Sequence, residues 1–153
     1  MEIKKFNYCY TEDVIPLLSS NVPYVFPHHP YIYWIMGEYF PSLCFIAQEG
    51  TKIEGFICAL HSFEKNCIFI WQLVINGVCR RTGTARLLCE KIIDYAYKND
   101  IRTLQMTIND ENIASIGFFT ALAKQYGTIL EKITLEELNS FEGESSYEVN
   151  FDL

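Results

Sequence analysis

The chain has 153 residues, of which 50% are hydrophobic, and it carries 12 basic against 19 acidic residues. This length fits one α/β domain, and the net charge of −7 disfavours nucleic acid as a partner, because phosphate contacts need clustered Lys and Arg. No apolar run reaches the roughly 18 residues of a membrane span and the N-terminus is unlike a signal peptide, so we expect a cytoplasmic protein without a membrane partner.

The first third of the chain predicts one strand and two short helices. Glu2–Tyr8 is typical of an edge strand, and Thr11 should cap a short helix. Residues 21–30 contain three prolines and should form an irregular loop. Tyr31–Phe40 should form a second helix with an aromatic face, which Pro41 ends.

The middle of the chain predicts three strands, a helix and a fourth strand. Leu43–Ala47, Gly55–Ser62 and Ile68–Ile75 are rich in β-formers and joined by hairpin-length turns, which indicates an antiparallel meander. Gly83–Lys98 repeats leucine and isoleucine at helical spacing and should pack one face inward. Thr103–Ile108 then alternates as a strand.

The last third predicts one more helix and two strands. Asn112 should cap a helix that ends near Tyr126. Thr128–Ile133 and Tyr147–Phe151 are typical of strands, with a short helical turn at Leu135–Leu138 before the second. No repeat or interdomain linker interrupts the chain.

The cysteines indicate reduced thiols. None has C-x-x-C spacing, and most sit in apolar strand or helix patterns, which disfavours a disulfide framework or a zinc site. They are Cys9, Cys44, Cys58, Cys67, Cys79 and Cys89. His28 and His29 are adjacent and lack a nearby third ligand, so no metal is expected.

The stretch from Ile68 to Leu88 is the most informative in the chain. A run of β-formers leads into a short basic turn with a glycine, and the turn opens into an amphipathic helix. This arrangement favours an anion site, because unpaired backbone N–H groups and the positive end of the helix converge there. Gly83 and Ala85 would let a large anion approach the backbone closely. Positive charge around it would come from Arg80, Arg81 and Arg86.

Two common phosphate loops do not fit this turn. In a P-loop the spacing of Gly77 and Gly83 would be one residue shorter, and a lysine would replace Thr84. A dinucleotide fingerprint needs three spaced glycines on the first strand of a βαβ unit. The remaining pattern, Arg80-x-x-Gly83-x-Ala85, resembles the (Gln/Arg)-x-x-Gly-x-(Gly/Ala) signature of GNAT N-acetyltransferases.

The second match to that family is the helix start at Asn112, with an aromatic residue, Phe119, seven positions later. The predicted order β-α-α-β-β-β-α-β-α-β-β is the GNAT order over residues 1–153. The resemblance therefore implies a single domain of α/β (α+β) class. Its central sheet would be mixed and largely antiparallel, with six or seven strands, splayed at the fourth and fifth, and flanked by about four helices.

The resemblance also implies acetyl-CoA as cofactor, with its pyrophosphate in the loop and its pantetheine beside the preceding strand. The cofactor-binding residues would be Leu73, Val74, Ile75, Arg80, Arg81, Thr82, Gly83, Thr84, Ala85, Arg86, Asn112, Ser115 and Phe119. Backbone N–H groups of Leu73 to Ile75 would stabilise the oxyanion. Phe119 stands where many family members have a Tyr that protonates the leaving thiolate, so the usual general acid is missing.

Within the family, the Trp71-Gln72 pair, the Asn112-Ile-Ala-Ser115 helix start and Phe119 resemble the diaminobutyrate acetyltransferases of ectoine synthesis. This resemblance implies direct transfer of acetyl, in a ternary complex, to a primary amine of a small diamine or amino-acid-like substrate. The chain departs from those enzymes in one loop. Their Asp and Asn-Ser before a tyrosine helix start are replaced by Phe26 and by His28-His29.

The residues expected to contact the acceptor amine are Trp71, Gln72, Tyr31, Tyr33 and His29. Glu142 and Glu144 are the candidates for general base and ammonium recognition, and Trp71 joins them at the reacting centre through a cation–π contact. For each, a plainer interpretation stays open. The acidic residues could be a solvated face, the tyrosines and Trp71 could pack the core, and the histidines could be exposed to solvent.

Two other functions fit the same residues. One is acetylation of a protein N-terminus or lysine. The other is a non-catalytic acyl-CoA-binding sensor, which the absence of Tyr at Phe119 motivates. A homodimer is compatible with the sequence.

Overall fold

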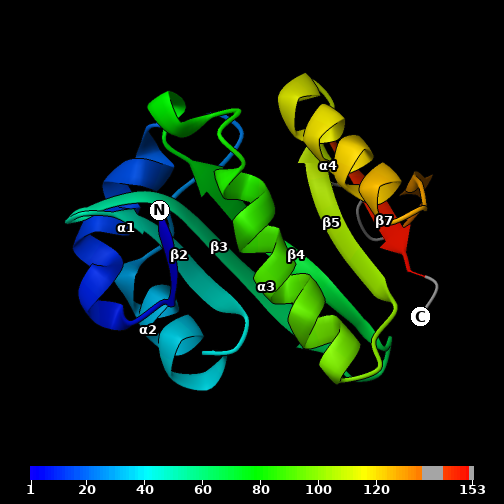
Figure 1. Ribbon diagram of the computed structural model, residues 1–153, viewed down its shortest axis with the longest axis horizontal. Coiled ribbons are helices and arrows are strands. Elements are labelled where there is room, and N and C mark those ends of the chain that lie inside the picture. Colours follow the sequence, from blue (N-terminus) through cyan, green and yellow to red (C-terminus); the bar gives the residue numbers. More distant parts are fainter. Residues whose placement is uncertain (136–142, 152–153) are drawn as a thin grey trace. The chain divides into compact units, whose positions relative to one another are not determined.

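The structure is a computed structural model that describes residues 1–135 and 143–151. Its helices and strands follow the predicted order (Figure 1). They are β1 (Glu2–Lys5), the 3-10 helix η1 (Tyr8–Tyr10), α1 (Thr11–Ser19), α2 (Pro30–Tyr39), β2 (Cys44–Glu49), β3 (Lys52–Ser62), β4 (Cys67–Ile75), the 3-10 helix η2 (Gly77–Cys79), α3 (Thr84–Lys98), β5 (Thr103–Asn109), α4 (Ile113–Gln125), β6 (Leu130–Ile133) and β7 (Glu144–Asn150). The turn predicted at Leu135–Leu138 lies mostly outside the described residues.

The strands are hydrogen-bonded in the order β1-β2-β3-β4-β5-β7-β6. The pairs β1–β2, β2–β3, β5–β7 and β6–β7 are antiparallel, and β4–β5 is parallel. The parallel ladder joins Cys67–Ile70 of β4 to Thr103–Met106 of β5. A mixed, largely antiparallel sheet of seven strands is thereby confirmed, whereas the splaying of β4 from β5 stays a prediction.

The chain divides into two compact units. Unit 1 comprises Met1–Leu60 and Trp71–Tyr95, and unit 2 comprises His61–Ile70 and Ala96–Leu153. The division runs through β3, β4 and α3, because each of these elements contributes residues to both units. The prediction of a single domain over the whole chain stays a prediction.

The core of unit 1 forms where α1 and α2 cover the strands. Phe6, Tyr33 and Phe56 meet edge to face, with ring centroids 5.3 to 6.5 Å apart. Val14 and Leu18 of α1 are fully buried in the same cluster. Aromatic pairs in this geometry add stability beyond their buried area.

One prediction about the helices of unit 1 was wrong in detail. Thr11 does not cap α1, because its hydroxyl donates to the Tyr8 carbonyl (2.6 Å) and the cap position falls on Tyr10, at the end of η1. The predicted aromatic face of α2 points largely to solvent. Tyr31 and Trp34 are exposed and stack on each other, whereas Tyr33 is the buried aromatic residue.

The helix α3 begins one residue after the predicted start and ends as predicted. The buried positions of α3 agree with the expected spacing, with two exceptions. Cys89 is buried as well, and Leu87 is only half-buried. The buried residues are Leu88, Cys89, Ile92, Ile93 and Ala96. All six cysteines are free, and four of them are buried.

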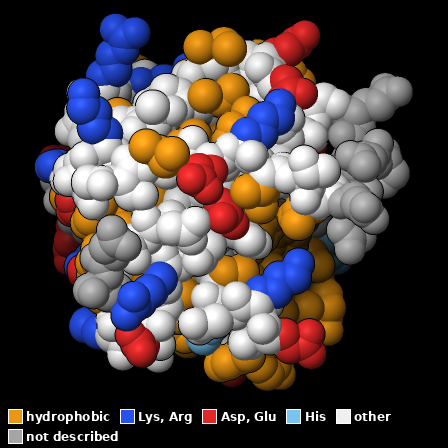
Figure 2. Space-filling view, turned by 90° about the vertical axis from the view of Figure 1, so that its right-hand side faces the viewer, with side chains coloured by type: hydrophobic (Ala, Val, Ile, Leu, Met, Phe, Trp, Pro, Cys, Tyr) orange, Lys and Arg blue, Asp and Glu red, His pale blue; other side chains and the backbone are white. Residues whose placement is uncertain are grey.

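In unit 2 the strands β5 and β7 pair in register along their whole length, from Thr103–Asn150 to Asn109–Glu144. The ring of Phe151, just after β7, contacts Tyr97 and Tyr126 edge to face. Among the described residues, no helix combines the length and the apolar character that a membrane crossing needs. On the face that Figure 2 shows, described acidic and basic side chains are interspersed.

Candidate functional site

The loop between β4 and α3 has the backbone that an anion site needs. Gly83 has a φ of +87°, in the left-handed region where a side chain is strained, and a Cβ built there meets no heavy atom within 4 Å. Its carbonyl accepts the Leu87 N–H (3.0 Å), so Gly83 is the N-cap of α3. The N–H groups of the first turn of a helix have no intrahelical partner. The N–H groups that follow Gly83 therefore have no partner within the helix, and the space beside Gly83 is open to a ligand.

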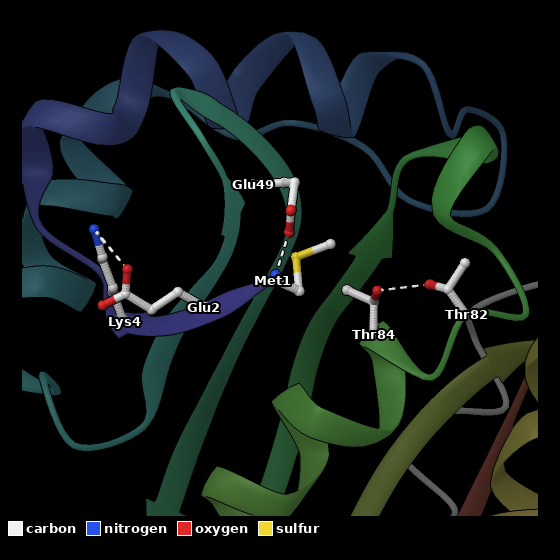
Figure 3. Close-up of polar contacts among 6 residues, drawn as sticks. All are labelled: Met1, Glu2, Lys4, Glu49, Thr82 and Thr84. Carbon is white, nitrogen blue, oxygen red and sulfur yellow. Dashed lines mark hydrogen bonds and ion pairs between the residues drawn. The ribbon is translucent and has the colours of Figure 1, made fainter.

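Both threonines of the loop use their hydroxyls inside the protein. The Thr82 hydroxyl donates to the Cys79 carbonyl (2.6 Å) and lies 2.9 Å from the Thr84 hydroxyl (Figure 3). Thr84 is buried, whereas Thr82 is exposed. The side chains thus brace the loop, and any contact of these two residues with an anion would come from their backbone N–H groups.

The three arginines predicted around the anion differ in the side chains that they contact. Arg80 donates to the side-chain oxygen of Asn21 (3.0 Å), which ties the loop to the residues after α1. Arg86 lies 3.7 Å from Glu90, one turn further along α3. Arg81 is exposed and has a φ of +64°. Both contacts involve partly exposed side chains, which a phosphate could displace at small cost.

A buried carboxylate supports the base of the loop, and sequence reasoning missed it. Glu54 of β3 is buried, and its carboxylate accepts from the Asn76 side-chain amide (2.7 Å). The Asn76 N–H in turn donates to the Glu54 carbonyl (2.8 Å), and the Asn76 side chain accepts from the Val78 N–H (3.4 Å). Next to Glu54, a Cβ on Gly55 would lie 2.9 Å from Ile75. The end of β4 is therefore held in place before the loop starts.

The residues predicted on the acceptor side also belong to unit 1. Tyr33 and Gln72 are both buried, and the Tyr33 hydroxyl donates to the side-chain oxygen Oε1 of Gln72 (3.3 Å). The Gln72 amide donates to the Phe26 carbonyl (2.7 Å), and the Tyr33 hydroxyl accepts from the His28 N–H (2.9 Å). These two residues hold the loop after α1 in place. Burial raises the pKa of Tyr33 above its usual range, which keeps the phenol protonated.

The aromatic and histidine side chains predicted at the acceptor site have different environments. Trp71 is half-buried against the core of unit 1, and its ring lies against that of His28, with centroids 4.7 Å apart. The neighbouring His29 uses Nδ1 to accept from the Tyr31 N–H (3.2 Å) and so caps α2. Tyr31 itself is exposed. Leu73, Val74 and Ile75 continue β4, and the Val74 side chain is in the core.

Unit 2 carries the remaining predicted site residues. Asn112 is the N-cap of α4, because its side-chain oxygen accepts from the Ser115 N–H (3.1 Å). Phe119 is buried and packs edge to face on Phe118. The cap was predicted and is confirmed. Cofactor contacts of Asn112, Ser115 and Phe119 stay predictions.

Glu144, the first residue of β7, has a perturbed carboxyl group. Partial burial raises its pKa above the usual range of glutamate, and the Asp110 carboxylate acts in the same direction. Hydrogen bonds from Asn109 and Thr107 oppose the shift. Such a group holds its proton to higher pH than a solvated glutamate. Glu142, the other predicted acid, lies outside the described residues.

A strand that runs into a braced loop, with an open left-handed glycine at the N-cap of the next helix, is an arrangement that can bind an anion. Residues 11–123 match the acetyltransferase (GNAT) family, and the chain belongs to that family.

Two relatives within this family have the same name. The chain is 32% identical, over 67% of its length and 54% of the relative's, to an L-2,4-diaminobutyric acid acetyltransferase of Halalkalibacterium halodurans. It is 31% identical to the Shouchella clausii protein of the same name, over 78% of this chain and 68% of that one. The matched part thus spans little more than half of the first relative.

The solved structures agree on the fold. The structure of diaminobutyrate acetyltransferase EctA from Paenibacillus lautus, in complex with L-2,4-diaminobutyric acid and coenzyme A, superposes with a TM-score of 0.86 at 22% identity. The superposition covers 97% of this chain and 93% of that one. Naa20 from Chaetomium thermophilum, in complex with a bisubstrate analogue, gives 0.81 at 16% identity, covering 100% and 87%.

Proposed function

We propose that this chain is an acetyl-CoA-dependent N-acetyltransferase that acts on a primary amine of a small diamine or amino-acid-like substrate of the diaminobutyrate class. The observation that carries the proposal is the open Gly83 at the N-cap of α3, directly after β4. Membership of the GNAT family and the names of the relatives support the reaction and the acceptor class.

The loop residues fit the pyrophosphate of acetyl-CoA, which would supply the acetyl group as a thioester. Backbone N–H groups of Thr84, Ala85 and Arg86 would donate to phosphate oxygens, because the helix leaves them free and the helix dipole favours an anion there. Arg81 would add a charge-assisted contact from its exposed side chain. Gly83 would let the phosphate come close to the backbone.

The acceptor amine must react unprotonated, although an alkyl ammonium has an ordinary pKa of about 10. A negative partner or a proton acceptor must therefore act on it. We keep Glu144 as the negative partner, a role that it can fill only when its carboxyl group, whose pKa is raised by partial burial, is ionised. Trp71 offers an aromatic face to a cation. Backbone N–H groups of Leu73 to Ile75 remain our proposal for the oxyanion.

The proposal is tested by a turnover screen that follows the release of free coenzyme A thiol. The acceptors are diaminobutyrate, ornithine, lysine, spermidine, an aromatic amine and a short peptide with a free N-terminus. We expect turnover with diaminobutyrate or a close diamine. Release with the peptide alone would point to a protein acetyltransferase, and acetyl-CoA binding without release across the panel would point to a sensor.

The labelling of Cys79 should report cofactor binding without any mutation. Desolvation raises the pKa of the Cys79 thiol, and the Glu54 and Glu49 carboxylates raise it further. Alkylation should therefore need a higher pH than an ordinary thiol does, because the thiolate is the reacting form. Saturating acetyl-CoA should slow the labelling of Cys79, which directly precedes Arg80, as peptide mass spectrometry would show. Unchanged labelling would place the cofactor away from the loop.

Phe119→Tyr should leave turnover the same or higher, because it restores the family's acid position without removing a contact. Phe119 is buried, so an unpaired hydroxyl there would lower stability by about 1–3 kcal/mol. Steady-state kinetics and thermal unfolding measure the two effects separately. A hundredfold loss of turnover in a folded variant would show that the site needs the apolar ring.

A further inference from the structure

We infer that His28 accepts the proton of the acceptor amine in the proposed acetyl transfer; the inference rests on the proposed function. The two adjacent histidines have different environments. His29 is occupied as the cap of α2, whereas the ring of His28 lies on Trp71, with an interplanar angle of 31°. Within residues 1–135 and 143–151, neither ring nitrogen of His28 makes a hydrogen bond or an ion pair.

The position of His28 is fixed by buried groups. Its backbone N–H donates to the Tyr33 hydroxyl, which lies within hydrogen-bond distance of Gln72, and Gln72 also holds the Phe26 carbonyl. Tyr33 is 1% exposed and Gln72 is 5% exposed. Two buried polar side chains thus position the loop on both sides of Pro27. His28 is only half-buried, which leaves the residue accessible to a small molecule.

No charged side chain of this loop competes with His28 for the proton of the amine, because residues 21–30 contain no Asp, Glu, Lys or Arg. A neutral imidazole has one nitrogen that donates and one that accepts. His28 can therefore take a proton from an amine that lies against Trp71, the residue before Gln72 on β4. Trp71 is four residues from Ile75 at the end of β4, a span of about 13 Å at the usual strand rise.

The proposed step carries one proton from the amine to the thiolate through His28. The amine nitrogen attacks the thioester carbonyl carbon, so a C–N bond forms and the C–S bond breaks. The surplus proton on the nitrogen moves to the free ring nitrogen of His28. The departing thiolate then takes a proton from the His28 imidazolium, which returns to its neutral form. His28 would thus serve as both base and acid, in a chain that has Phe119 where the family's usual acid stands.

The test uses His28→Phe, which keeps an aromatic ring against Trp71 and removes both nitrogens. We expect kcat to fall about 100-fold, the lower range for general acid–base catalysis, with acetyl-CoA affinity and Tm unchanged. His61→Phe is the matched control, because His61 also lies against an aromatic ring, that of Phe63, 4.1 Å between centroids. It should keep the kcat of the parent chain.

A second variant separates proton transfer from loop geometry. His28→Ala should lose activity to the same extent, and imidazole added to the buffer should restore part of kcat in proportion to its concentration. Unchanged kcat in His28→Phe, a change in the amine KM alone, or a loss that imidazole does not repair would each overturn the inference. A parent chain that releases no coenzyme A with any amine would instead refute the proposed function.

Discussion

Gly83→Asp should abolish acetyl-CoA binding and leave the chain folded. The new carboxylate would lie where we expect the pyrophosphate, at a backbone position that a large anion must approach closely. Folding should survive for two reasons. Aspartate tolerates the left-handed region better than most residues. Nothing lies within 4 Å of the added Cβ. Calorimetry should show affinity at least about 100-fold weaker, a loss of some 2.7 kcal/mol.

Gly50→Asp is the matched control. Gly50 also has a left-handed φ, +59°, and open space around a built Cβ, but it lies in the turn between β2 and β3. It brings the same charge and the same kind of backbone strain. We expect its acetyl-CoA affinity to equal that of the parent chain. Parent-like affinity in a folded Gly83→Asp variant would contradict the assignment of the loop.

Glu144→Gln should lower kcat/KM for the amine by about 10- to 150-fold, because it keeps the shape and removes one charge-assisted hydrogen bond of about 1.5–3 kcal/mol. Acetyl-CoA affinity should barely change. The role requires the ionised carboxylate, so activity should fall as the pH decreases. Because the pKa of Glu144 is raised, this fall should begin at a higher pH than for an ordinary glutamate. The Gln variant should lack this part of the pH profile.

Glu148→Gln tests whether any acidic residue of β7 has the same effect. Glu148 lies on the same strand, and its carboxylate accepts from Gln105 of β5 (3.3 Å) and from Asn150 (2.9 Å). We expect kcat/KM within about twofold of the parent value, since a partly exposed hydrogen bond contributes little. Equal losses in both variants would indicate a general effect of charge. Full activity in Glu144→Gln would show that Glu144 belongs to a solvated face.

The parts of the site that the sequence predicted are those that local chemistry determines. Gly83 and the helix after it follow from the spacing of a few adjacent residues. The cap at Asn112 follows from its side chain alone. Family resemblance then connected these local signals along the whole chain, and the strand order agrees with it.

What the sequence could not predict depends on contacts between distant segments. The pair of Glu54 and Asn76 is separated by 22 positions, and that of Tyr33 and Gln72 by 39. Neither pair has a local pattern, although Asn76 directly after a strand is a turn signal. The sequence does not tell which of the two adjacent rings, that of His28 or that of His29, caps α2. This depends on the three-dimensional structure. Thr11 was misassigned because a 3-10 helix precedes it.

The most direct test of the central claim is a time course with acetyl-CoA and L-2,4-diaminobutyrate, in which released thiol and acetylated amine are quantified together, the amine product by NMR. We expect thiol release that depends on the amine, with one N-acetylated product formed for each thiol. We also expect the loss of both signals in Gly83→Asp and their retention in Gly50→Asp. Tight binding of acetyl-CoA with no amine-dependent release, for diaminobutyrate and every other amine of the panel, would contradict the proposed N-acetyltransferase activity.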